Sequence, residues 1–149
     1  MGYYDSVEIS ASGLSAERLA MDVIANNIAN ANTTRTPQGG AFKRQLVVFA
    51  QKAGAADANG DPFNPMQPEK PNVEGVQVLG VTDDQSPDRL VFDPSNPEAD
   101  PRGYVHYPNV QVVKEMVDMM AASRAYQANV AAIQESRSMS QADMSLLKS

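Results

Sequence analysis

Apolar positions in the C-terminal quarter of the chain repeat with the spacing of a long helix. Alternating steps of four and three from Val112 land mostly on apolar or aromatic residues as far as Leu147. Such a repeat, sustained over about five heptads, predicts a coiled-coil seam rather than a short globular helix. A continuous helix here would be about 58 Å long, too long to be buried inside one small domain. Asn109, which follows Pro108, is the expected N-cap.

A second helix is predicted near the N-terminus, from Asp5 to Ala31, a stretch without proline. Acidic residues occupy its first turn, where the helix dipole favours them, and a run of Asn and Thr before Pro37 ends it. We expect the two terminal helices to pair, and any apolar stripe left uncovered to meet another molecule. The isolated chain is therefore expected to have partly disordered ends.

The middle of the chain has the composition of short strands and loops. All ten prolines and seven of the nine glycines lie between Pro37 and Pro108. Strand-like runs occupy residues 42–49, 76–81, 90–92 and 104–107, and we expect a mobile surface loop from Ala53 to Asn72.

The predicted fold is mainly α with a small β-rich middle. The long N- and C-terminal helices pair as a coiled-coil-like core, with the central strands and loops outside. Three segments follow from this division: an N-terminal helical core segment (1–36), a central β and loop region (37–108) and a C-terminal helical core segment (109–149).

The composition excludes several classes of function. A net charge of -6 in 149 residues is the wrong sign for a nucleic-acid-binding protein. No apolar run reaches the roughly 18 residues of a membrane-spanning helix, and no secretory signal peptide is recognisable. The absence of cysteine excludes disulfides and thiolate metal sites.

A search for catalytic motifs finds none that holds. The sequence has no phosphate-binding loop, dinucleotide fingerprint or nucleophile elbow. His106 is the only histidine and lies in a predicted strand. The stretch Asp57 to Asp61 has the start of a calcium loop, but Pro62 occupies the position that needs glycine. We therefore predict no catalytic, cofactor-binding or metal-binding residue and no enzymatic activity.

Three asparagines interrupt the apolar stripe of the first helix: Asn26, Asn27 and Asn30. A buried asparagine at a helix–helix seam costs stability but fixes register and partner number. The alternative is that these residues mark only the fraying end of the helix, because asparagine favours turns.

Two pairs of motifs resemble the bacterial flagellar rod and hook proteins. The first pair is SASGLSAER at residues 10–18 and DVIANNIANANT at 22–33, similar to the N-terminal signature of this family. The second pair is SPDRLVFDPSNPEAD at residues 86–100 and GYVHYPNVQVVKEMVDMMAASRAYQANV at 103–130, which resembles the proximal rod subunits within it. The resemblance covers about two-thirds of the chain, and the segment from Ala53 to Asn72 lies outside it.

This resemblance implies a structural subunit of the flagellar basal body. Subunits of this family build a hollow helical rod, which crosses the periplasm and transmits motor torque to the hook. The resemblance also implies export by the flagellar type III apparatus, without a cleavable signal peptide. The implied partners are other copies of the chain, other rod subunits, and neighbouring ring and export-gate adaptor proteins. Cofactors and nucleic acid are not expected.

Residues on the two apolar stripes are the candidates for subunit contacts, although packing within one subunit explains the methionines equally well. Two alternatives to a proximal rod subunit stay open: another rod or hook-basal-body subunit, and a coiled-coil export adaptor. The candidate interface residues are Leu14, Val23, Ile24, Asn27, Ile28, Met116, Met119, Met120, Tyr126, Val130 and Ile133.

Overall fold

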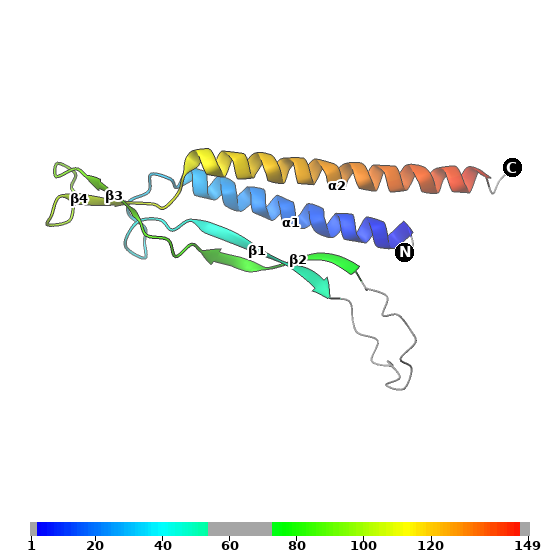
Figure 1. Cartoon of the computed structure of the whole chain (residues 1–149), viewed down its shortest axis with the longest axis horizontal. Coiled ribbons are helices and arrows are strands. Elements are labelled where there is room, and N and C mark those ends of the chain that lie inside the picture. The colour runs from blue at the N-terminus through cyan, green and yellow to red at the C-terminus, as the bar shows by residue number, and fades with distance from the viewer. Residues whose placement is uncertain (1–2, 54–72, 147–149) are drawn as a thin grey trace, which may run out of the picture.

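The computed structural model of the chain describes residues 3–53 and 73–146 (Figure 1). Helix α1 spans Tyr3–Ala29 and helix α2 spans Val112–Leu146. Between them lie two antiparallel hairpins, one of strands β1 (Gln45–Ala53) and β2 (Val73–Asp83), the other of β3 (Arg89–Phe92) and β4 (Tyr104–Tyr107). Figure 1 shows α1 between α2 and the β1–β2 hairpin, so α1 is the central element of three.

The two helices run antiparallel along a seam of small and polar residues with a seven-residue spacing. Contacts between Ser6 and Ser136, Gly13 and Asn129, and Asn27 and Glu115 mark three of four successive heptads. Ala20 and Ala122 are both buried in the remaining heptad. The pairing is therefore coiled-coil-like, but small side chains rather than large apolar ones bring the helices together.

The β1–β2 hairpin packs against α1 through a close contact at Gly75. This residue is buried, and its φ of 96° is in a region that disfavours side chains. A Cβ atom here would collide with the hydroxyl oxygen of Ser12. That hydroxyl accepts a hydrogen bond of 3.0 Å from the Val76 amide and donates one of 2.7 Å to the Ile9 carbonyl. Glycine therefore allows the strand to contact the helix directly.

The β3–β4 hairpin lies beyond the end of the helix pair (Figure 1). Its strands pair Leu90 with His106 and Phe92 with Tyr104, while Val105 of the central pair is only 1% exposed. The Phe92 and Tyr104 rings pack edge to face, with centroids 5.3 Å apart. One face of this hairpin is thus anchored and the other, with Leu90 and Phe92, is exposed.

The predicted fold is confirmed: long terminal helices pair and the middle forms small antiparallel sheets. The two hairpin strands of the first sheet differ in extent from the expected runs, because continuous pairing carries β1 to Ala53 and β2 from Val73 to Asp83. The expected loop lies outside the described residues except for Ala53. Asn109 is not the N-cap, since the Gln111 carbonyl accepts the first helical bond, from Glu115.

Candidate assembly surface and the polar junction behind it

A buried polar junction joins α1, β1 and α2. The Asn27 side chain is 1% exposed and its amide nitrogen donates to the Gln45 carbonyl at 2.8 Å and to Glu115 Oε2 at 3.0 Å. Its carbonyl oxygen accepts the Gln45 amide at 2.9 Å. Asn27 therefore satisfies both backbone groups of the first β1 residue and holds α2 at the same time.

Arg44, which immediately precedes β1, neutralises the carboxylate at the centre of the junction. Its Nε donates to Glu115 Oε1 at 2.5 Å, and the Glu115 side chain is 0% exposed. The guanidinium also lies 3.3 Å from Asp118 Oδ2 and 3.6 Å from Asp84 Oδ2. One planar, permanently charged group thus contacts carboxylates from α2 and from the loop after β2.

Asn109 and Asp84 hold the loops on the outer side of the junction. Asn109 accepts the Arg44 amide at 2.9 Å and donates its own amide nitrogen to the Asp84 and Ser86 carbonyls. Hydrogen bonds from the Ser86 hydroxyl and amide, together with nearby Arg44, lower the pKa of the Asp84 carboxyl from its usual 3.8. The Asn109 side chain is occupied in joining three segments instead of capping α2.

The eleven candidate interface residues fall into three groups by exposure. Val23 and Asn27 are buried within the chain. Met116 and Met120 are 54% and 53% exposed. The remaining seven are half-buried: Leu14, Ile24, Ile28, Met119, Tyr126, Val130 and Ile133.

Large apolar side chains are exposed along the first turns of α2. Val113 is 77% exposed and Val117 is 54% exposed, and Met116 and Met120 continue the same patch. An exposed apolar cluster at helical spacing is typical of a surface that contacts another molecule. These four residues, Val113, Met116, Val117 and Met120, form the α2 apolar patch.

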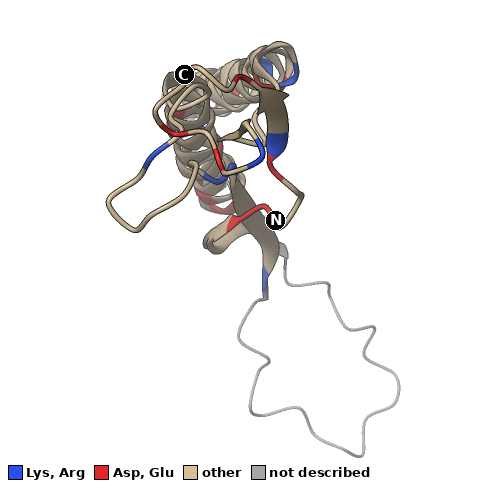
Figure 2. Ribbon diagram, turned by 90° about the vertical axis from the view of Figure 1, so that its left-hand side faces the viewer, with Lys and Arg blue, Asp and Glu red and all other residues tan. Residues whose placement is uncertain are grey.

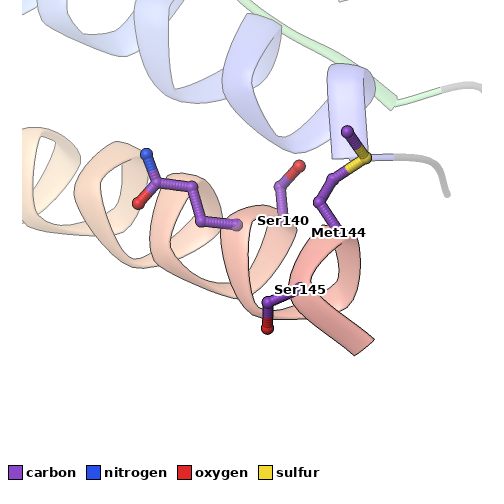
Figure 3. Close-up of a pocket in the computed structure, with 4 residues that line it drawn as sticks. Ser140, Met144 and Ser145 are labelled. Carbon is purple, nitrogen blue, oxygen red and sulfur yellow. The ribbon is translucent and has the colours of Figure 1, made fainter. Parts of the chain in front are cut away.

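A shallow depression near the end of α2 is lined by Ser140, Gln141, Met144 and Ser145 (Figure 3). In this view Met144 points towards the first turn of α1 and Ser145 points away from it. None of the four is an acid, base or activated nucleophile. We therefore assign this depression no catalytic role and regard it as a product of side-chain packing.

A second hollow, at the base of the β3–β4 hairpin, contains His106 and Asp88. The His106 Nδ1 atom lies 3.5 Å from Asp88 Oδ2, and Asp88 also pairs with Lys43 at 2.5 Å. His106 is half exposed, at 52%. Across the described ranges, no group of three or more His, Asp or Glu side chains is placed to hold a metal ion.

Acidic and basic residues are mixed along the chain. Figure 2 shows Lys and Arg positions interspersed with Asp and Glu positions on the ribbon. Within the described part of the chain, neither helix has an apolar stretch sufficient to cross a membrane.

Sequence patterns found Asn27 but missed its partners Gln45 and Glu115, and they missed Arg44, which pairs with Glu115. Glu115 looks like an ordinary acid in the first turn of α2, and Arg44 precedes a strand like many surface arginines. Arg44 and Glu115 are 71 positions apart in the sequence, and only the fold brings them together.

The chain matches two family models and several curated proteins. Residues 8–35 match "Flagella basal body rod protein" and residues 102–146 match "Flagellar basal body rod FlgEFG protein C-terminal". The chain is 43% identical to the flagellar basal-body rod protein FlgC of Borreliella burgdorferi, covering 99% of both proteins. It is 40% identical to FlgC of Escherichia coli over 93% of both, and 38% identical to FlgC of Bacillus subtilis over 93% of this chain and 94% of the relative. The chain therefore belongs to the FlgC family of flagellar basal-body rod proteins, which are structural subunits rather than enzymes.

Proposed function

We propose that this chain is a subunit of the proximal rod and assembles helically, through its terminal helices, into the hollow drive shaft of the flagellum. The observation that carries the assembly step is the α2 apolar patch, whose four large side chains are 53% to 77% exposed. Copies of the chain and other rod subunits are the proposed occupants of this surface.

The energetics favour covering this surface on assembly. Burying about 1,000 Å² of apolar surface per subunit yields about 25 kcal/mol at about 25 cal/mol per Å². The loss of rigid-body freedom on association costs about 4–15 kcal/mol. A subunit that leaves its large apolar residues outside its own helix seam is therefore driven to assemble.

The candidate interface residues take different parts in this proposal. Met116 and Met120 contact neighbouring subunits directly, and methionine suits neighbours of different shape because its side chain adapts. Leu14 and Ile28 lie half-buried on α1 and complete the contact. Val23 and Asn27, buried within the chain, hold the helix pair in the shape that presents these surfaces.

The three segments take different places in the rod. We propose that residues 1–36 and 109–149 form the inner core of the tube and that residues 37–108 face outwards. The rod crosses the periplasm, so the subunit is a substrate of the flagellar type III export apparatus and is exported without a cleavable signal peptide. Ring and export-gate adaptor proteins are the proposed neighbours outside the rod.

The test compares two variants in a strain from which the gene has been deleted. Val117→Asp places a charge in the α2 apolar patch, and Gln77→Asp places the same charge at an exposed polar position of β2, outside both helices. We expect Val117→Asp to abolish rod completion and swimming, whereas Gln77→Asp restores both. Equal restoration by both variants, with equal amounts of exported protein, would contradict the assembly role of the patch.

A further inference from the structure

We propose that neighbouring copies of this chain contact each other by packing the outer face of α2 against the open face of α1, displaced along the axis by about one helical turn. This inference rests on the proposed function, because it specifies the contact through which the rod is built. It adds the two faces, their register and the charged pair that selects this register.

The outer face of α2 is the side opposite the helix seam. It begins with Val113, Val117 and Met120, continues through exposed Arg124, and ends in small residues at Ala128 and Ala131. Seam residues such as Glu115 and Ala122 are buried, so the two faces of α2 are distinct. The side chains of the outer face are therefore large and apolar at the start of α2 and small further along the helix.

The open face of α1 is the side that neither α2 nor the β1–β2 hairpin covers. It contains exposed Ala29, Ala25 and Arg18, with exposed Asp22 at its edge and half-buried Leu14 towards its start. Because the helices are antiparallel, the small end of this face lies beside the large end of the α2 outer face (Figure 1). The two faces thus complement each other in size along their length.

Size alone leaves the register undecided, and charge decides it. Within one chain, the seam contacts Gly13–Asn129 and Asn27–Glu115 place Arg18 level with Arg124. A neighbour without axial displacement would therefore set these two arginines against each other. A displacement of four residues, about 6 Å at 1.5 Å per residue, sets Arg124 opposite Asp22 instead.

The same displacement keeps the size match. Val117 then faces Ala29, and Ala128 faces Arg18, so in both pairs a larger side chain meets a small one, while Val113 lies beyond the last residue of α1. A displacement of one turn in the other direction would leave Arg124 without an acid opposite and would bury Asp22 against Met116. The ion pairs among the described residues join other side chains, and Asp22 and Arg124 are both exposed, so these two charges can pair between copies.

A contact between two different faces does not close on itself. Each copy then offers an unused α2 outer face on one side and an unused α1 open face on the other. With an axial displacement at every step, repetition of this contact generates a helix of subunits. The geometry therefore yields a rising array rather than a closed dimer.

A charge exchange tests the register. Asp22→Lys and Arg124→Glu each create a like-charge contact in every pair of copies, and we expect each to lower the yield of completed rods about tenfold or more. The double variant restores opposite charges and should recover most of that yield. Normal rods in both single variants, or no recovery in the double variant, would overturn the proposed register.

Disulfide trapping gives a second, independent measurement. The chain contains no cysteine, so an introduced pair acts on a clean background. Oxidised rods containing Ala29→Cys/Val117→Cys, which keep Arg18, Asp22 and Arg124, should yield a ladder of cross-linked multimers, whereas Ala25→Cys/Val117→Cys should yield about tenfold less. The matched control pair reports the register without displacement, and a stronger ladder from it would overturn the inference.

The outcome also separates this inference from the proposed function. If rods contain the chain but neither cysteine pair forms multimers, the contact is wrong while the rod role stands. If purified rods lack the chain altogether, the proposed function fails and this inference fails with it.

Discussion

Asn27 and Glu115, 88 positions apart in sequence, are joined by a hydrogen bond of 3.0 Å in the most buried part of the molecule. The Glu115 side chain has no solvent exposure and Asn27 has 1%. Because Asn27 also bonds both backbone groups of Gln45, this contact fixes the position of α2 relative to α1 and to the first hairpin at once. A polar contact of this kind sets register, since any slip would leave buried groups unpaired.

Asn27→Asp should destabilise the protein far more than its small change in size suggests. The substitution removes the donor to Glu115 and places a second carboxylate beside it. We expect a loss of about 3 kcal/mol in the free energy of unfolding, measured by urea denaturation. The matched control is Asn26→Asp on the exposed side of the same turn, for which we expect less than about 1 kcal/mol.

Glu115→Ala should be among the most destabilising substitutions in the chain. It leaves Arg44, which is only 13% exposed, without its main partner and removes the acceptor of the Asn27 bond. We expect a loss of about 3–5 kcal/mol by the same denaturation measurement. Glu8→Ala, at an exposed ion pair with Lys52, should cost less than about 1 kcal/mol. Similar losses in the two variants would mean that the junction contributes little.

Gly75→Ala should loosen the first hairpin from α1. The new Cβ would occupy a strained backbone conformation and collide with the Ser12 hydroxyl, so we expect a cost of about 2–3 kcal/mol. Gly39→Ala is the control, because its φ of 89° carries the same strain but nothing lies within 4 Å of the added atom. A difference between the two variants isolates the collision, and equal costs would refute the close contact.

Acid should weaken the loop anchor that Asp84 provides. Hydrogen bonds from Ser86, and then the charge of Arg44, lower the pKa of Asp84 below 3.8 in the folded state. A group with a lowered folded pKa contributes full stability above its ordinary pKa and loses it as the pH falls through the folded value. Carboxyl-carbon NMR titration should therefore give an Asp84 midpoint below 3.8. The Ser86→Ala variant should raise that midpoint, and an unchanged midpoint would exclude the serine as its cause.

The terminal part of α2 should be ordered by assembly. Ser6 contacts Ser136, so α1 begins near residue 139 of α2, and α2 continues to Leu146 with Met139 and Met144 exposed. We expect rapid amide exchange in this last stretch of the isolated chain and strong protection in purified rods. A fully protected isolated helix would contradict the expectation of disordered ends.

Local sequence patterns predicted the elements well because each depends on neighbouring residues. The 3.5-residue repeat identified α2, and proline and glycine bounded the β-rich middle. The same repeat misplaced the start of the helix seam, since Val112 and Met116 are exposed while Glu115 is buried. A buried glutamate is compatible with that face only because Arg44 and Asn27 reach it from distant segments, which no local pattern encodes.

Electron microscopy of basal bodies from a strain lacking this gene shows whether a rod forms without this subunit. We expect ring structures without a completed rod or hook, and recovery of both when the wild-type gene is restored. The Gln77→Asp variant should restore them as well. Complete rods and hooks in the deletion strain, with no second copy of the gene present, would contradict the role as a rod subunit.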